Sequence, residues 1–298
     1  MLKDQVAFGM PTIRHVLFPY DFSTQGRQIV PFVRALATCF SARVTLFSVV
    51  PPPFESVSAG MGGPRLRSGD EVTEWRENLQ RRLDGALLEE WAGLCVERVA
   101  DNGDPALRTV DFASSHGVDL IMMPTHGVGT FRSFLVGSVT SKVLHDATCP
   151  VWTAAHAESQ TAPAMPRTIL CAIDGSAATP AIARWAAEFA REAGARLTLL
   201  HVVDPVSDWP SLESERRLQE HVRNDARERI MAMLTFADVD PSVRVALGGI
   251  VETVTEEAKQ ERADLVIIGR GSVPEPFGRL RTHAFGIIQR APCPVLSL

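Results

Sequence analysis

The residues with the clearest potential for chemistry are two spaced glycines that follow an apolar stretch. Gly127 and Gly137 are separated by nine residues, and Ser138 follows directly. Glycine lets backbone N–H groups approach a ligand closely, and a helix start adds unpaired N–H groups and a positive dipole end. With the hydroxyls of Ser138 and Thr140, the pattern predicts a phosphate-binding loop. The alternative is a tight turn that packs a helix on a strand. Pro124, at the mouth of the loop, removes one N–H and fixes φ.

Two aspartates stand at matching places where an apolar segment gives way to a helix. Asp21 and Asp174 are each followed two residues later by a serine, Ser23 or Ser176. A carboxylate there would accept hydrogen bonds from an exocyclic amine or a sugar hydroxyl. Asp and Ser also form turns and helix caps, so a purely local role fits the same residues. We expect ligand contact for Asp21, and for Asp174 both interpretations stay open.

The glycine loop also contains a histidine, His126, which could contact phosphate or transfer a proton, although a solvated loop histidine fits equally. The sequence shows no Walker-type lysine in this loop, and no arrangement of residues that indicates a metal site or a catalytic triad. Without such a lysine, fast phosphoryl transfer is not expected. We therefore expect a binding protein, with slow hydrolysis of a bound nucleotide as the upper limit.

The elements that must position these residues occur twice in the chain. The segment HVLFPYDFS (15–23) resembles TILCAIDGS (168–176), and VDLIMMP (118–124) matches ADLVIIG (263–269). The offset between the copies falls from 153 positions to 145, so the first copy carries the longer insert. We assign that insert to the Pro/Gly/Ser-rich segment 51–70, which is typical of a surface loop.

The repeat predicts the domain organisation. A chain of 298 residues has room for two average domains. We expect one domain over 12–155 and a second over 167–298. The segment 156–166 between them is polar and contains proline, as a short linker would.

Within each copy, apolar strands alternate with amphipathic helices. The strands are continuous apolar runs, as a sheet buried on both faces requires. The periodicity predicts a long helix over 71–92 that places Trp75 and Trp91 in the core. The other helices expected in the first copy are 23–40, 104–116 and 138–146, and the strands expected in the two copies are 14–18, 43–49, 95–100, 119–123 and 150–153, then 168–173, 196–202, 242–246, 264–268 and 294–297.

This alternation predicts the α/β fold class, with two tandem doubly wound parallel five-stranded sheets and helices on both faces. In such sheets ligands bind beyond the carboxyl ends of the strands, where the strand order reverses. Asp21 and the loop 124–130 should therefore lie near each other.

Composition excludes several classes of protein. A net charge of −5 argues against a nucleic-acid binder with a broad basic face. No stretch of 18 apolar residues is present, so we expect no membrane span, and the first residues do not resemble a signal peptide. The five cysteines are scattered without a CxxC pair, which argues against a disulfide framework or a zinc site and favours a cytoplasmic location.

A family resemblance follows from these motifs. A strand ending in Asp21, the sequence Thr-His-Gly ending at Gly127, nine residues, Gly137-Ser138, and then KVLHDATCPV (142–151) resemble the universal stress protein family. The resemblance covers nearly the whole chain and implies a tandem member with an adenine nucleotide alpha hydrolase-like fold. It implies ATP, with or without Mg²⁺, as a ligand of the first domain. By resemblance, Pro19, Asp21 and Val44 would line the adenine and ribose side, and Met123, Pro124, Gly127, Gly137, Ser138, Val139 and Thr140 the ribose-phosphate side.

The first domain keeps most of the pattern that marks the ATP-binding branch of this family, which is Gly-x-x-Gly, nine residues, and Gly-Ser or Gly-Thr. Pro124 replaces the first glycine. The second copy departs further, because Ser272 replaces the second glycine and the spacing is one residue shorter. We therefore expect at most a degenerate second site, formed by Asp174, Gly269, Arg281 and Thr282.

Three functions remain open at this point. In the first, the chain is a universal stress protein whose first domain binds ATP, and occupancy regulates the stress response through conformation or partner contacts. In the second, it is a structural or regulatory stress protein that acts by protein–protein interaction without a nucleotide. In the third, it is an enzyme that activates a substrate with ATP.

The last strands of the two copies indicate how the domains associate. The segments 149–153 and 293–298 are apolar potential edge strands. In the family, last strands commonly pair two domains, so we expect the two copies to pair within one chain. A homodimer of two chains is a further expectation.

Overall fold

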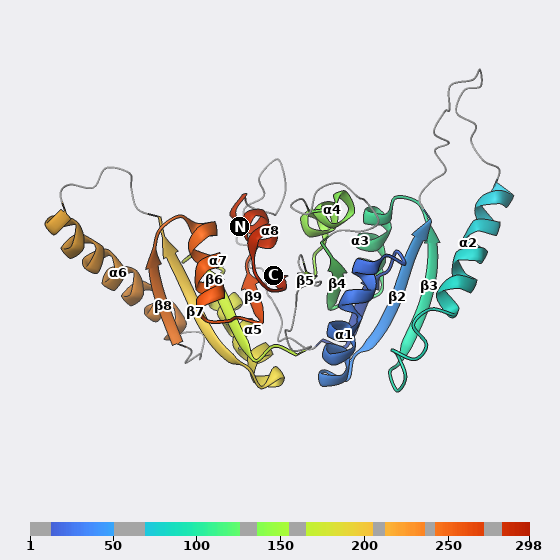
Figure 1. The fold of residues 1–298 in the computed structure, drawn as a ribbon, viewed down its shortest axis with the longest axis horizontal. Coiled ribbons are helices and arrows are strands. Elements are labelled where there is room, and N and C mark those ends of the chain that lie inside the picture. Colours follow the sequence, from blue (N-terminus) through green and yellow to red (C-terminus); the bar gives the residue numbers. More distant parts are fainter. Residues whose placement is uncertain are drawn as a thin grey trace, which may run out of the picture.

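Strands and helices alternate throughout both halves of the chain (Figure 1). This computed structural model describes residues 13–50, 69–125, 136–154, 165–204, 212–235, 242–270 and 282–298. The strands are β1 (His15–Pro19), β2 (Arg43–Val50), β3 (Val96–Asn102), β4 (Leu120–Pro124) and β5 (Val151–Ala154), followed by β6 (Thr168–Ile173), β7 (Arg196–Val203), β8 (Ser242–Leu247), β9 (Leu265–Ile268) and β10 (Val295–Ser297).

The strands form one ten-stranded sheet with the order β3-β2-β1-β4-β5-β10-β9-β6-β7-β8. Neighbouring strands within each half are parallel, while β5 and β10 pair antiparallel. The predicted fold class is confirmed, because each half is a doubly wound parallel sheet of five strands. The predicted pairing of the last strands also occurs, and it joins the two sheets into one.

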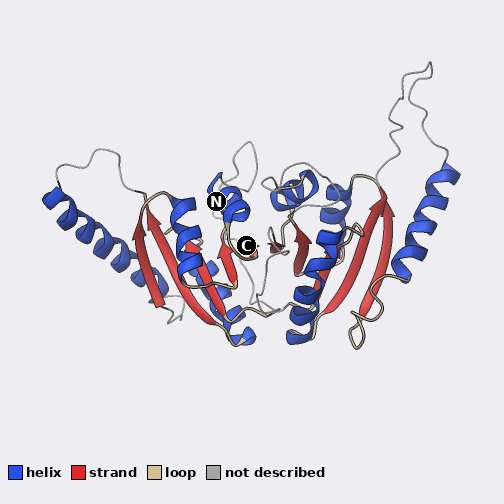
Figure 2. Cartoon of the chain, viewed as in Figure 1, coloured by secondary structure: helices blue, strands red, loops and turns tan. Residues whose placement is uncertain are grey.

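The helices cover both faces of this sheet (Figure 2). Side chains of α1, α2, α5 and α6 pack into one buried apolar cluster, and those of α3, α4, α7 and α8 pack into a second. Of the helices described, none combines the length and the apolar run needed to cross a bilayer. Their bounds are α1 (Thr24–Cys39), α2 (Gly69–Asp84), α3 (Pro105–Ser115), α4 (Ser138–Asp146), α5 (Thr179–Ala193), α6 (Leu212–Thr235), α7 (Ile250–Gln260) and α8 (Thr282–Arg290).

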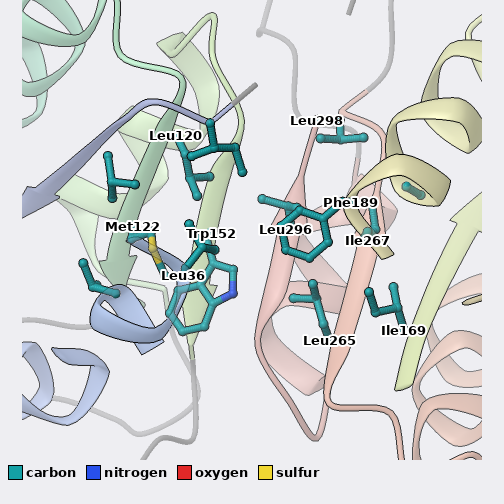
Figure 3. Close-up of a cluster of buried hydrophobic side chains, with 14 of the residues drawn as sticks. Leu36, Leu120, Met122, Trp152, Ile169, Phe189, Leu265, Ile267, Leu296 and Leu298 are labelled. Carbon is teal, nitrogen blue, oxygen red and sulfur yellow. The ribbon is translucent and has the colours of Figure 1, made fainter. Parts of the chain in front are cut away.

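The junction between the halves is apolar at its centre and polar along its backbone. Apolar side chains meet across the junction in Figure 3, where Leu36, Met122 and Trp152 face Phe189, Leu265 and Leu296. All six side chains are buried. The Thr153 hydroxyl donates to the carbonyl of Val295 at 3.2 Å. The Ser297 hydroxyl donates to the carbonyl of Val151, also at 3.2 Å. These two bonds relate equivalent positions of the repeat, so the junction has approximate two-fold symmetry.

One prediction about the helices was wrong. The expected helix over 71–92 ends at Asp84, and Leu87 has a φ of 54° that breaks helical geometry. Trp91 therefore reaches the core from a separate turn and is 3% exposed, whereas Trp75 on α2 is 43% exposed. The helical spacing of apolar residues over 71–92 therefore combined residues from two segments that do not share a helix face.

The amino end of β1 contains a buried histidine. His15 is 3% exposed, and its Nε2 lies 2.8 Å from the Thr45 hydroxyl. Its Nδ1 lies 3.0 Å from the Arg43 guanidinium and 3.2 Å from the carbonyl of His116. Burial, followed by the charge of Arg43, lowers the pKa of His15 below its ordinary value of 6.5.

We expect His15 to make folding stability depend on pH. In the unfolded chain this histidine takes up a proton as the pH falls through about 6.5, while in the folded chain it resists protonation. Its contribution to stability is therefore present above that pH and is lost as the pH falls through the lower folded pKa. Urea midpoints at about pH 7.5 and about pH 5.5 should differ more in the wild type than in His15→Gln. Equal differences in both proteins would contradict this role.

Candidate functional site

The candidate site lies where the strand order reverses. Beside β1, the chain places β2 on one side and β4 on the other. Ligands of doubly wound sheets bind beyond the carboxyl ends of the strands at such a switch point. Pro19 ends β1 and Pro124 ends β4, so the structure brings these two predicted site residues to the same edge.

The two prolines end the hydrogen-bond ladder between β1 and β4 at this edge. The Tyr20 N–H donates to the carbonyl of Phe47 on β2. Because the backbone groups of successive residues point toward opposite neighbouring strands, the backbone nitrogen and carbonyl of Pro19 point toward β4. The Thr125 N–H donates to the carbonyl of Ala154 on β5, so the backbone nitrogen of Pro124 points toward β1. Neither proline has an N–H to give. The carbonyls of Pro19 and Met122 therefore receive no strand-to-strand hydrogen bond here.

The second half shows what the sheet does without these prolines. There, β6 and β9 pair in register from Ile169–Leu265 to Ala172–Ile268, whereas β1 and β4 pair only at Val16–Leu120 and Leu17–Ile121. The positions equivalent to the two prolines are Ala172 and Gly269. The shorter ladder between β1 and β4 is thus a property of the first domain.

The start of α4 lies next to the end of β4. Gly137 is the N-cap, with φ −60° and ψ 151°, and no described side chain caps it. Its own N–H donates to the carbonyl of Thr125 at 2.7 Å. The Thr140 hydroxyl donates to the carbonyl of Pro124 at 3.0 Å. These two predicted phosphate donors already have partners, so they fix α4 against the end of β4.

The donors that suit a ligand are the backbone N–H groups of the first turn. The first N–H groups of a helix have no acceptor within it, and the dipole makes this end positive. Ser138 is exposed and Val139 is half-buried, so both lie near the surface of the helix start. Met123 is 4% exposed and packs in the core below the edge. Gly127 and His126 lie outside the described residues.

Asp21 follows β1 at the same edge. Its Oδ1 accepts the N–H of Ser23 at 3.0 Å, which is the local turn role. Ser23 in turn caps α1 by accepting the N–H of Gly26 at 3.0 Å, as expected. The Asp21 side chain is also exposed, so a local role and ligand contact are compatible.

The residue after Asp21 was missed by sequence reasoning. Phe22 has a φ of 61°, a strained conformation for a residue with a Cβ, and its counterpart in the second copy is Gly175 with a φ of 73°. Its ring centroid lies 4.9 Å from that of Tyr20, and the Arg82 guanidinium lies 4.3 Å from its centre. These contacts hold an aromatic side chain beside the candidate site.

Val44 is not brought to this edge. It is fully buried at the amino end of β2, level with Val16, whereas Pro19 is level with Phe47. The β2 residue that lies just beyond that level is Ser48, which is 5% exposed. The sequence feature that could have indicated Ser48 is the length of the strand, which continues beyond Phe47.

In the second domain, the equivalent edge is arranged differently. Asp174 Oδ1 accepts the N–H of Ser176 at 2.9 Å and lies 3.5 Å from the Thr179 hydroxyl, which is again a turn. Gly269 follows β9 directly, and a Cβ there would lie 2.6 Å from Ile182 Cδ1. Arg281 lies outside the described residues, and Thr282 begins α8, with its side chain not described. The structure therefore places Asp174 and Gly269 near the end of the β6–β9 ladder.

Comparison with known proteins identifies the family. The universal stress protein family matches residues 12–154 and 165–298. A universal stress protein of Mycolicibacterium smegmatis is 28% identical over 262 residues, covering 85% of this chain and 86% of that protein. Universal stress protein G of Shigella flexneri is 33% identical over 117 residues, covering 37% of this chain and 82% of its own.

A solved structure agrees in fold across both halves. The crystal structure of a universal stress protein from Archaeoglobus fulgidus has a TM-score of 0.67 at 19% identity and covers 97% of each chain. At this identity the likeness supports the fold. Together with the two family matches, it shows that the chain belongs to the universal stress protein family and carries the family's domain twice.

Proposed function

We propose that the first domain binds an adenine nucleotide, ATP with or without Mg²⁺, and that occupancy regulates a stress response through conformation or partner contacts. One observation carries the proposal: the hydrogen-bond ladder between β1 and β4 stops before the prolines that end both strands, and the uncapped start of α4 lies beside that end of β4. The helix start suits phosphate. The carbonyls of Pro19 and Met122, which receive no ladder hydrogen bond, suit a donor such as an exocyclic amine.

In this proposal each site residue has a defined task. The N–H groups of Ser138 and Val139 would hold phosphate oxygens, and Gly127 is a further proposed contact. Asp21 would accept a hydrogen bond from a ribose hydroxyl. Gly137 and Thr140 would act indirectly, because their bonds to Thr125 and Pro124 hold the helix start in place.

Isothermal titration of purified protein with ATP tests the proposal. We expect saturable binding with a micromolar Kd, and adenine nucleotide released when freshly purified protein is denatured. No saturable binding at millimolar ATP with Mg²⁺ would contradict it. That result would favour the second candidate, a stress protein that acts through protein contacts alone, which the altered motif of the second copy also suits.

We propose a binding role rather than an enzymatic one. Single-turnover measurements should find ATP hydrolysis slow or undetectable. An assay of ATP–pyrophosphate exchange with candidate acids should detect no exchange.

A cytoplasmic location is part of the proposal, because all five cysteines are free, as in a reducing compartment. We also propose that two chains associate into a homodimer. Light scattering during gel filtration would measure the mass of the assembly.

A further inference from the structure

A buried arginine links the second domain to α4 of the first. Arg270 follows β9 by two residues and is 4% exposed. Its guanidinium donates to the carbonyls of Ala147 at 2.8 Å, Cys149 at 2.7 Å and Leu144 at 3.3 Å. Its backbone N–H donates to the carbonyl of Leu298 at 2.9 Å, which fixes the base of the side chain.

These contacts satisfy the carboxyl end of α4. The last carbonyls of a helix have no donor within it, and the dipole makes this end negative. A buried cation is costly unless it is hydrogen-bonded, and here it meets several carbonyl oxygens. Arg270 is therefore placed to anchor this end of the helix and to complement its dipole.

The opposite end of the same helix is the proposed phosphate contact. α4 has nine residues, from Ser138 to Asp146, so it is about 13 Å long. Its amino end is fixed through Gly137 and Thr140 to the end of β4. Its carboxyl end is held by Arg270 from the other domain.

The residue of the first copy that is equivalent to Arg270 makes its contact within its own domain. The position equivalent to Arg270 in the first copy is Thr125. The Thr125 hydroxyl donates to the carbonyl of Ala154 at 2.9 Å, within its own domain. The arginine thus extends from the domain with the degenerate motif to the domain with the more complete one.

We propose that Arg270 is a positioning residue for the phosphate end of the site, acting through α4, an inference that rests on the proposed function. Its cation offsets the negative end of the helix dipole and so favours an anion at the other end. Its hydrogen bonds hold the helix at the angle at which the first-turn N–H groups meet the ligand. By linkage, nucleotide binding stabilises the contact between the two domains.

The test compares Arg270→Met and Arg270→Lys with the wild type, and uses Arg244→Met as the matched control. Arg244 is another arginine of the second domain, but it pairs with Glu257 within that domain. Titration with ATP and with adenosine separates a phosphate effect from a general loss of structure. We expect Arg270→Met to weaken ATP about three- to tenfold. We expect adenosine binding to stay unchanged, Arg270→Lys to recover part of the loss, and Arg244→Met to bind both ligands as the wild type does.

Hydrogen exchange of ligand-free protein gives a second measurement. We expect Arg270→Met to increase exchange along α4 from Ser141, whose N–H donates to Gly137, and Arg244→Met to leave α4 unchanged. If the wild type binds ATP and Arg270→Met binds it equally well, or loses ATP and adenosine alike, the inference is overturned while the proposed function stands. If the wild type binds no ATP, both fail. Should Arg270→Met not fold, the ATP-to-adenosine ratio of Arg270→Lys decides: a lowered ratio supports the inference and a wild-type ratio overturns it.

Discussion

Replacing Gly137 with arginine is expected to abolish nucleotide binding by the first domain. The change imitates the second copy, which has Arg281 where the first has Gly137. Gly137 has a φ of −60°, which any residue adopts, and its N–H bond to Thr125 does not depend on the side chain. The protein should therefore fold, while the new side chain fills the space that a phosphate needs. We expect at least a 100-fold loss of ATP affinity, or about 2.7 kcal/mol, measured by titration calorimetry.

The control is the same substitution at a distant glycine. Gly85 follows α2, has no positive φ, and a Cβ there would meet only backbone oxygens at 3.9 Å. Gly85→Arg changes the net charge equally and should leave ATP affinity within about twofold of the wild type. Unchanged affinity in Gly137→Arg would place the nucleotide elsewhere on the protein.

The fold could be predicted from the sequence because its physical signals are local and occur twice. Runs such as Leu120–Met123 are apolar throughout, as strands covered on both faces must be. The repeat then fixed the number of domains without any knowledge of contacts. The end of α2 was not predictable in the same way, since helical spacing continued past the turn at Leu87.

The sequence predicted which strand ends lie at the same edge, but not how the residues there are hydrogen-bonded. Strand ends placed Asp21, Pro124 and Gly137 together, whereas the hydroxyl of Thr140 was expected to face a ligand and instead bonds Pro124. The sequence left open whether the N–H that Pro124 lacks is needed by the site. In the structure the nitrogen of Pro124 faces β1, where Pro19 also lacks an N–H, so the two prolines together end the ladder between β1 and β4.

Arg270 was missed because its partners are distant in the chain. The carbonyls that it bonds lie 121 to 126 positions earlier. Only the repeat gave a signal, since a threonine in the first copy is an arginine in the second. A charged residue that replaces a small one at a buried repeat position indicates a contact specific to one copy. Phe22, opposite Gly175, is a related case in which the two copies differ in side-chain size rather than in charge.

The second large effect concerns the junction between the domains. Trp152 is 4% exposed, pairs with Leu296 of the other domain, and its ring lies 5.2 Å from that of Phe32. Because its neighbours are themselves fixed in strands and in α1, they cannot close around the cavity that truncation leaves. Both domains should lose stability together, since the buried cluster includes side chains of each (Figure 3).

We expect Trp152→Ala to lower the free energy of unfolding by about 3–5 kcal/mol, measured by urea titration followed by circular dichroism. The matched control is Trp75→Ala, which removes the same side chain from a position that is 43% exposed and should cost about 1 kcal/mol or less. Equal losses in the two variants would contradict the burial difference. Two separate unfolding transitions in the wild type would show instead that the domains do not share a core, because a cluster buried by both halves must be exposed when either one unfolds.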